Sequence, residues 1–195
     1  MIDKKEEIIA STFKHFASHG YSLSMSEIAK DVCIKTPSLY SHFSGKDEII
    51  YQAIEQEVAS YYKFLNKVYK DNSDKATNEQ LKNIFFTVVE YFKINNRLRF
   101  WKNVLLINNS DLREKSFKLV FDLENHHLEN MKIVFGSNNM QNETNEDEIE
   151  ANALLFLAMI QGALEAELLL YKTEDNADEY LSKIWSSYEK GICKS

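Results

Sequence analysis

Apolar residues recur along the chain at spacings of three and four, which is the pattern of amphipathic helices. Strict alternation of apolar and polar residues, typical of a half-buried strand, does not stand out anywhere. Polar breaks divide the pattern into about nine helical segments. These expected helices cover about residues 8–19, 24–32, 36–43, 46–69, 81–94, 98–107, 110–135, 148–171 and 177–192. The sequence therefore predicts an all-α fold.

The stretch from Ser24 to Lys46 predicts two short helices joined by a tight turn. Ser24 can accept a hydrogen bond from an amide of the first helix, and Glu27, three residues later, completes a capping box. The second helix is expected to have Thr36 as its cap and Pro37 in its first turn, because proline suits the first helical position. With the helix before them, these segments predict a three-helix head that contains a helix-turn-helix.

The second of these short helices is expected to have one buried and one exposed face. Leu39 and Phe43, four residues apart, would pack on Ile28. The other positions carry hydroxyl, imidazole and ammonium groups, which can bind phosphates and base edges in a major groove. We expect the start of the helix to reach bases, and its later residues with Lys46 to hold phosphates. The predicted DNA-binding residues are Ser24, Lys35, Thr36, Pro37, Ser38, Tyr40, His42 and Lys46.

This stretch resembles the signature of the TetR/AcrR (tetracycline repressor-like) family of transcriptional regulators. The shared positions are Ile28, Ala29, Ile34, Leu39, Tyr40, His42, Phe43 and Lys46. Two positions depart from the family pattern, since Cys33 replaces a turn glycine and Lys35 replaces a serine cap. The turn at Cys33 must therefore either avoid a positive φ or tolerate the strain there.

The resemblance implies a DNA-binding domain at residues 1–46 and a helical ligand-binding and dimerisation domain at residues 47–195. It also implies a homodimeric repressor that binds a palindromic double-stranded operator and is released by a small-molecule effector in the second domain. The helix that starts at Lys46 would be the lever between the two domains; the alternative is a plain scaffold helix. An apolar or amphipathic effector is the simplest expectation.

Charge is distributed unevenly along the chain, whose net charge is −7. Residues 1–46 hold six lysines against five acidic residues, a net charge of +1, so the acidity lies in the rest of the chain. The head is weakly basic, and charge alone does not indicate DNA binding.

The start MIDKKEE is charged, and the longest apolar run, Ala153–Ile160, is far shorter than the ~20 residues needed to cross a bilayer. We therefore expect a cytoplasmic protein with no membrane contact.

The segment at 148–171 is apolar around most of its circumference, which favours partners on both sides. One partner is expected to be a second copy, as the resemblance also implies for the last two long helices; the alternative is a central helix in a monomeric bundle. The predicted interface residues are Leu155, Met159, Gly162, Glu165, Leu169, Leu181 and Trp185.

Aromatic residues in the second part of the chain suggest either a solid core or a ligand pocket with a few polar groups. The predicted pocket residues are Phe85, Val89, Phe92, Trp101, Asn103, Phe121, Glu124, His127, Phe156 and Met159. Individually, each is more typical of a core than of a ligand contact.

Two other functional classes remain as alternatives. A helical protein-interaction module could keep the head without reading DNA. A cofactor-dependent helical enzyme is suggested only by Glu124-x-x-His127, the spacing of di-iron bundles, which need a second such motif and two further carboxylates. Two cysteines, Cys33 and Cys193, cannot supply a four-ligand zinc site. We expect no cofactor, no metal and no catalytic residues, with His127 facing inward and His126 outward.

Overall fold

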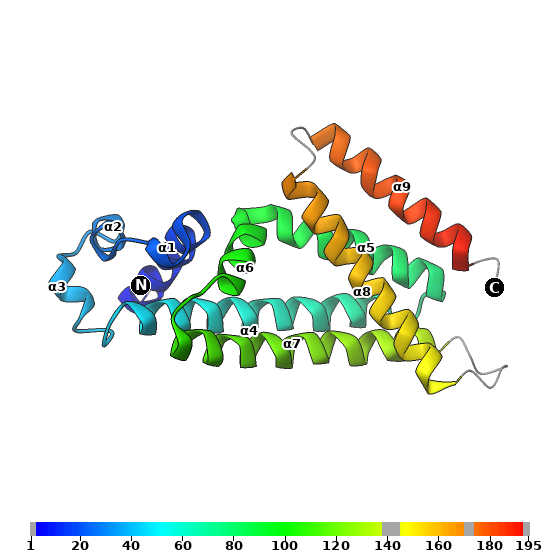
Figure 1. Cartoon of the computed structure of the whole chain (residues 1–195), viewed down its shortest axis with the longest axis horizontal. Helices are drawn as coiled ribbons and strands as arrows, with labels where there is room; N and C mark the ends of the chain where they lie inside the picture. The colour runs from blue at the N-terminus through cyan, green and yellow to red at the C-terminus, as the bar shows by residue number, and fades with distance from the viewer. Residues whose placement is uncertain (1–2, 138–144, 170–173, 193–195) are drawn as a thin grey trace. The chain divides into compact units, whose positions relative to one another are not determined.

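The computed structural model describes residues 3–137, 145–169 and 174–192, and within these ranges every regular element is helical, which confirms the all-α prediction. The elements are α1 (Lys4–His19), η1 (Gly20–Ser22), α2 (Met25–Asp31), α3 (Thr36–Leu39), α4 (Lys46–Asn72), α5 (Thr77–Lys93), η2 (Ile94–Asn96), α6 (Arg97–Leu105), α7 (Ser110–Gly136), α8 (Glu146–Leu169) and α9 (Glu174–Ile192), shown in Figure 1. Cys193 and the expected helix end at Tyr171 lie outside the described residues.

Contacts divide the chain into two compact units. The first unit contains Met1–Phe64 and Lys93–Glu124, and the second contains Leu65–Phe92 and Asn125–Ser195. Two long helices, α4 and α7, each contribute residues to both units. The head predicted at residues 1–46 therefore shares its compact unit with the start of α4, with η2 and α6, and with the first half of α7.

The core of the first unit joins the head to α6. Phe100 on α6 stacks on Phe13 with ring centroids 4.4 Å apart, and meets the edge of Phe16 at 5.2 Å. Phe16 and Phe100 are fully buried, together with Ile28 and Leu39 of the helix-turn-helix. The apolar stripe of α1 thus packs on α6 as well as on α2, and α6 fixes where the head lies on this unit.

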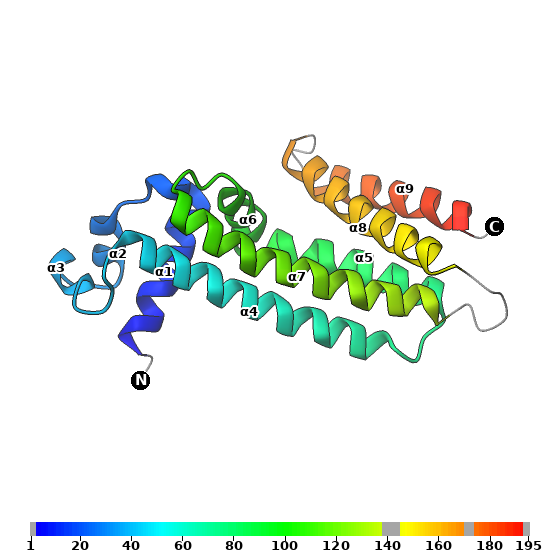
Figure 2. The same ribbon diagram turned by 60° about the horizontal axis from the view of Figure 1, so that its bottom comes forward.

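The second unit has an aromatic core between α5, α8 and α9. Phe85 and Phe156 are fully buried, and Trp185 on α9 lies 5.9 Å from Phe85 between ring centroids. Tyr188 contacts Phe156 at 5.6 Å. Figure 1 and Figure 2 show α8 and α9 side by side in this unit. Burial of these large rings provides the main driving force for this part of the fold.

Ser24 occupies the predicted cap position of α2 but makes no capping hydrogen bond, and the cap of α3 lies one residue before the predicted one. The Ser24 side chain does not cap α2; its hydroxyl instead shares a 2.7 Å hydrogen bond with that of Ser26. Thr36 is the first residue of α3, so Lys35 occupies the cap position and Pro37 follows within the first turn. A lysine side chain cannot accept a hydrogen bond from an amide, which leaves its ammonium group available to other partners.

Cys33 ends α2 in a left-handed conformation with φ of 57°. The Ile34 amide donates to the Ala29 carbonyl at 2.9 Å and the Cys33 amide to the Lys30 carbonyl at 3.1 Å. This is the Schellman motif, whose left-handed position usually belongs to glycine. The turn at Cys33 therefore does not avoid a positive φ but tolerates the strain of one.

We expect Cys33→Gly to raise the free energy of unfolding by about 1 kcal/mol, because glycine removes the Cβ strain of a positive φ. Chemical denaturation at fixed protein concentration measures the change. Cys33→Ala keeps a Cβ and should stay close to wild type. A glycine variant less stable than the alanine variant would contradict this account of the turn.

Candidate nucleic-acid interface

The helix-turn-helix buries the side chains expected to anchor it and leaves the predicted contact residues at the surface. Leu39 and Phe43 are buried in the same core as Ile28. Tyr40 is 56% accessible. Lys35, Pro37, Ser38 and His42 are exposed, and Ser24, Thr36 and Lys46 are partly exposed. The exposed groups include an ammonium, a phenol, an imidazole and hydroxyls, all of which can donate hydrogen bonds to phosphate oxygens.

Lys46 begins α4 in a structured setting that the sequence did not reveal. Its ammonium nitrogen lies 4.7 Å from the centroid of the Tyr21 ring. The Tyr21 hydroxyl donates to Asp47 Oδ1 at 2.7 Å, and this hydrogen bond raises the pKa of Tyr21. Asn109 Nδ2 donates to Asp47 Oδ2 at 3.1 Å. The start of α4 is therefore attached to both η1 and the segment before α7.

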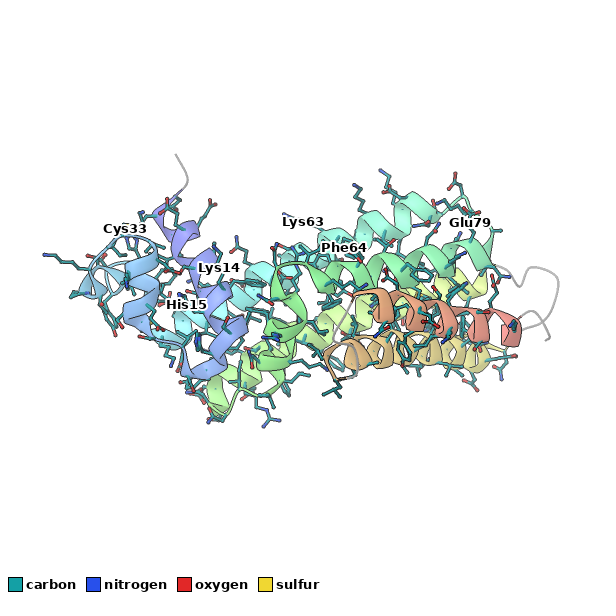
Figure 3. All side chains as sticks on the ribbon, turned by 90° about the horizontal axis from the view of Figure 1, so that it is seen from above. Lys14, His15, Cys33, Lys63, Phe64 and Glu79 are labelled. Atoms are coloured by element: carbon teal, nitrogen blue, oxygen red, sulfur yellow. The ribbon has the colours of Figure 1, made fainter. Side chains whose placement is uncertain are left out.

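A second pair of contacts connects α1 to α2. His15 Nε2 lies 2.8 Å from Asp31 Oδ2, and the Ser11 hydroxyl donates to the same oxygen at 3.2 Å. The hydrogen bond with His15 holds the pKa of Asp31 below its usual range. Figure 3 shows His15 on α1 and Cys33 near the start of the α2–α3 turn. These contacts hold α2 against α1, which places α3 on a rigid support.

Lys5 is a further cation of the head that sequence reasoning missed. Its ammonium nitrogen lies 5.4 Å from the centroid of the Phe43 ring, beside the segment that carries the predicted contacts. The only sequence signal for it was its place in the charged start of the chain. The ammonium groups of Lys5, Lys35 and Lys46 can each form an ion pair with a phosphate of a DNA backbone.

The predicted ligand-pocket residues belong to both compact units. Phe85, Val89, Phe92, His127 and Phe156 are buried in the second unit, and Met159 is half-buried there. Trp101, Asn103, Phe121 and Glu124 belong to the first unit. Phe121 is 65% accessible, and burial of the Glu124 carboxyl raises its pKa. A pocket formed by these ten residues stays a prediction.

Asn103 has hydrogen-bond partners that the sequence did not reveal. Its side-chain Nδ2 donates to the Phe16 carbonyl at 2.8 Å and to the Ala17 carbonyl at 3.1 Å, at the end of α1. An amide that satisfies two helix-terminal carbonyls has a structural role. In the sequence, a polar residue between the apolar residues of α6 cannot be distinguished from a group that orients a ligand.

The two neighbouring histidines lie as expected, one buried and one near the surface. His127 is buried, and burial together with the neighbouring His126 lowers its pKa to about 4, so its ring is neutral at pH 7. The Tyr69 ring meets it edge-on at 5.9 Å. His126 Nε2 lies 2.8 Å from Asn66 Oδ1. Both histidines thus have packing or hydrogen-bonding roles in the second unit.

The predicted interface residues divide into an exposed set on α8 and a buried set on α9. Leu155 and Leu169 are 60% and 77% accessible, Gly162 is exposed, and Met159 and Glu165 are half-buried. Leu181 and Trp185 are only 4% and 5% accessible, because they pack inside their own unit. Their place in the interface stays a prediction, since within the protomer their own unit covers both side chains. A Cβ added at Gly162 would have no atom of the protomer within 4 Å, apart from its chain neighbours and the backbone of its own helix.

Comparison with known sequences identifies the head. Residues 8–53 match the family described as bacterial regulatory proteins, tetR family. The negative transcriptional regulator IcaR of the icaADBC biofilm operon from Staphylococcus aureus is 36% identical over 73 residues, which span 37% of each protein. The HTH-type regulator YttP of Bacillus subtilis is 27% identical over 115 residues, 58% of this chain and 56% of YttP. The chain thus matches about a third to just over half the length of these relatives.

Comparison with solved structures extends the likeness in fold to nearly the whole chain. A TetR-family regulator structure from Mesorhizobium loti superposes with a TM-score of 0.77 at 17% identity, and the match covers 97% of this chain and 95% of that one. FadR from Bacillus subtilis, solved with stearoyl-CoA, has a TM-score of 0.66 at 16% identity, with coverage of 93% and 97%. Residues 8–53 therefore match the tetR family of bacterial regulatory proteins, and the chain as a whole shares the fold of these solved regulator structures.

Proposed function

We propose that this protein is a ligand-responsive transcriptional repressor that binds a palindromic operator as a homodimer. The observation that carries the proposal is the α2–α3 pair, in which Leu39 is buried and the neighbouring Tyr40 is exposed beside other hydrogen-bond donors. The residues proposed to contact DNA are Lys35, Thr36, Pro37, Ser38, Tyr40, His42 and Lys46, with Ser24 at the start of α2. Operator binding as a dimer is geometrically necessary, because two such helices must reach major grooves about 34 Å apart.

The exposed apolar face of α8 supports the dimer. Its accessible residues include Leu154, Leu155, Leu168 and Leu169, which would be unfavourable to leave in water. The segment Glu146–Ala166 is long and apolar enough to span a membrane by length and composition, and only 33% of its most apolar window is buried. A second copy that packs on this face accounts for its composition within a cytoplasmic regulator. We propose Leu155, Met159, Gly162, Glu165 and Leu169 as part of that interface.

The effector is proposed to be an apolar or amphipathic small molecule bound within residues 47–195. The aromatic core around Phe85 and Phe156 is the candidate region, provided that it opens to admit a ligand. The structure of FadR with stearoyl-CoA supports this class of effector for the fold. Because α4 runs continuously from Lys46 to Asn72, a ligand that shifts its second half would also move its first turn and the operator contacts. Ligand and operator would then exclude each other.

We expect Tyr40→Ala to weaken operator binding about tenfold or more without loss of stability, since it removes an exposed phosphate-binding group. Tyr40→Phe, which removes only the hydroxyl, should lose most of the same affinity. Tyr62→Ala, at an exposed tyrosine of α4, is the matched control and should bind as wild type. Fluorescence anisotropy with the DNA upstream of the protein's own coding region, at several salt concentrations, measures these affinities.

A helical protein-interaction module would give a different result. Its binding to DNA would be absent or weak for every duplex, and Tyr40 substitutions would change nothing. Salt-dependent affinity for one palindrome, reduced by Tyr40→Ala and unchanged by Tyr62→Ala, supports the regulator.

A further inference from the structure

The first unit contains a cleft of about 470 Å³ that none of the proposed DNA or effector contacts uses. It lies between α1, the middle of α4, η2 and the start of α6. Its volume is within the range of small-molecule sites. The lining residues are Ala10, Phe13, Lys14, Ala53, Gln56, Glu57, Ser60, Asn95, Asn96 and Arg97.

The charges that line this cleft sum to a single positive charge. Lys14 and Arg97 each contribute +1 and Glu57 contributes −1. Glu57 is buried, and Arg97 Nε lies 3.2 Å from its Oε1, so this carboxylate is already paired. Lys14 is exposed, and its charge also acts on Asp31 of α2, where it helps to lower the pKa of that carboxyl. The net positive charge of the lining therefore lies on Lys14, and it matches a single negative charge on a ligand.

The remaining lining groups specify the rest of the ligand. Gln56, Asn95 and Asn96 are exposed and bring amide groups, which can donate hydrogen bonds to oxygen atoms. Phe13 contributes an aromatic surface whose other face is already stacked on Phe100. A ligand that is apolar at one end and carries one carboxylate at the other fits both kinds of lining.

We propose that this cleft binds a small organic monocarboxylate with an aromatic or short aliphatic body. The carboxylate lies among Lys14, Asn95 and Asn96, and the apolar body lies against Phe13, Ala10 and Ala53. An occupant contacts α1 and α4 together, so it holds the head in its present position on the first half of α4.

Binding of benzoate to the ¹⁵N-labelled full-length protein, without DNA, tests the proposal independently of the proposed function. The backbone and side-chain amide signals of Asn95 and Asn96 should shift on titration. Benzamide, which has the same shape without the charge, should bind at least tenfold more weakly, and inorganic phosphate, which lacks an apolar body, should not reproduce the shifts.

Three charge variants sharpen the test. Lys14→Gln should weaken benzoate binding about three- to tenfold, because an exposed ammonium contributes on this scale. Glu57→Gln raises the net charge of the lining and should strengthen binding by a similar factor. Lys63→Gln, at an exposed lysine of α4 that does not line the cleft, should change it less than twofold; Figure 3 labels Lys14 and Lys63.

The proposal is overturned if millimolar benzoate leaves the Asn95 and Asn96 signals unmoved, or if benzamide binds as well as benzoate. It is also overturned if Lys14→Gln and Lys63→Gln have equal effects. Operator binding plays no part in these measurements, so their failure would leave the regulator proposal standing.

Discussion

We expect Leu155→Glu to convert the proposed dimer to a monomer, with a dissociation constant raised at least about 100-fold. Leu155 is 60% accessible in the protomer, so a glutamate there is tolerated by the isolated chain. In the proposed interface the same carboxylate would be buried without a partner, which costs several kcal/mol. Analytical ultracentrifugation over a range of concentrations measures the change, and operator affinity should fall in parallel.

The matched control for this variant is Ile133→Glu, because Ile133 is an equally large exposed aliphatic residue in the second unit but lies on α7. The Ile133→Glu protein should remain dimeric.

A second variant, Gly162→Val, introduces a side chain where the protomer has open space. If it weakens the dimer, a second chain must approach Gly162 closely. A Leu155→Glu protein that stays dimeric and binds operator normally would contradict the proposed interface.

The other large effect is expected in the first unit, where Phe100→Ala should lower the free energy of unfolding by about 3–5 kcal/mol. Phe100 is fully buried and contacts both Phe13 and Phe16 of α1. Removal of its ring leaves a cavity between the head and α6 that rigid helices cannot fully close. Denaturant unfolding at fixed protein concentration measures the loss.

Phe121→Ala is the appropriate comparison, since Phe121 lies in the same unit but is 65% accessible, and the cost should be below about 1 kcal/mol. If Phe100→Ala does not fold at all, Phe100→Leu provides a milder change with the same direction. Equal losses for Phe100→Ala and Phe121→Ala would show that the head is not anchored through α6.

Local chemistry made the head predictable from the sequence. Leu39 and Tyr40 are adjacent, yet helical periodicity correctly assigned one to the core and the other to the surface. Cap positions were less predictable, because Ser24 had a competing hydroxyl partner two residues away in Ser26. The sequence did not decide whether Cys33 has a positive φ. The hydrogen bonds at the end of α2 decide whether the strain of that conformation is tolerated.

Long-range partners explain the remaining differences. Asn103 binds carbonyls 86 and 87 residues earlier in the chain, and no local pattern reports such a contact. Trp185 lies on an amphipathic helix whose apolar stripe could equally have faced a second chain; its contact with Phe85 shows that it faces its own core. The cleft beside Lys14 arises from three separated segments and had no sequence signature at all.

Selection from random double-stranded DNA by the purified protein, without effector, tests the central claim most directly. The regulator account predicts enrichment of one palindrome whose half-sites are about one helical turn apart, bound with strongly salt-dependent affinity and lost in Tyr40→Ala. Failure to enrich any sequence at low salt, by a protein that is folded and dimeric, would contradict the account.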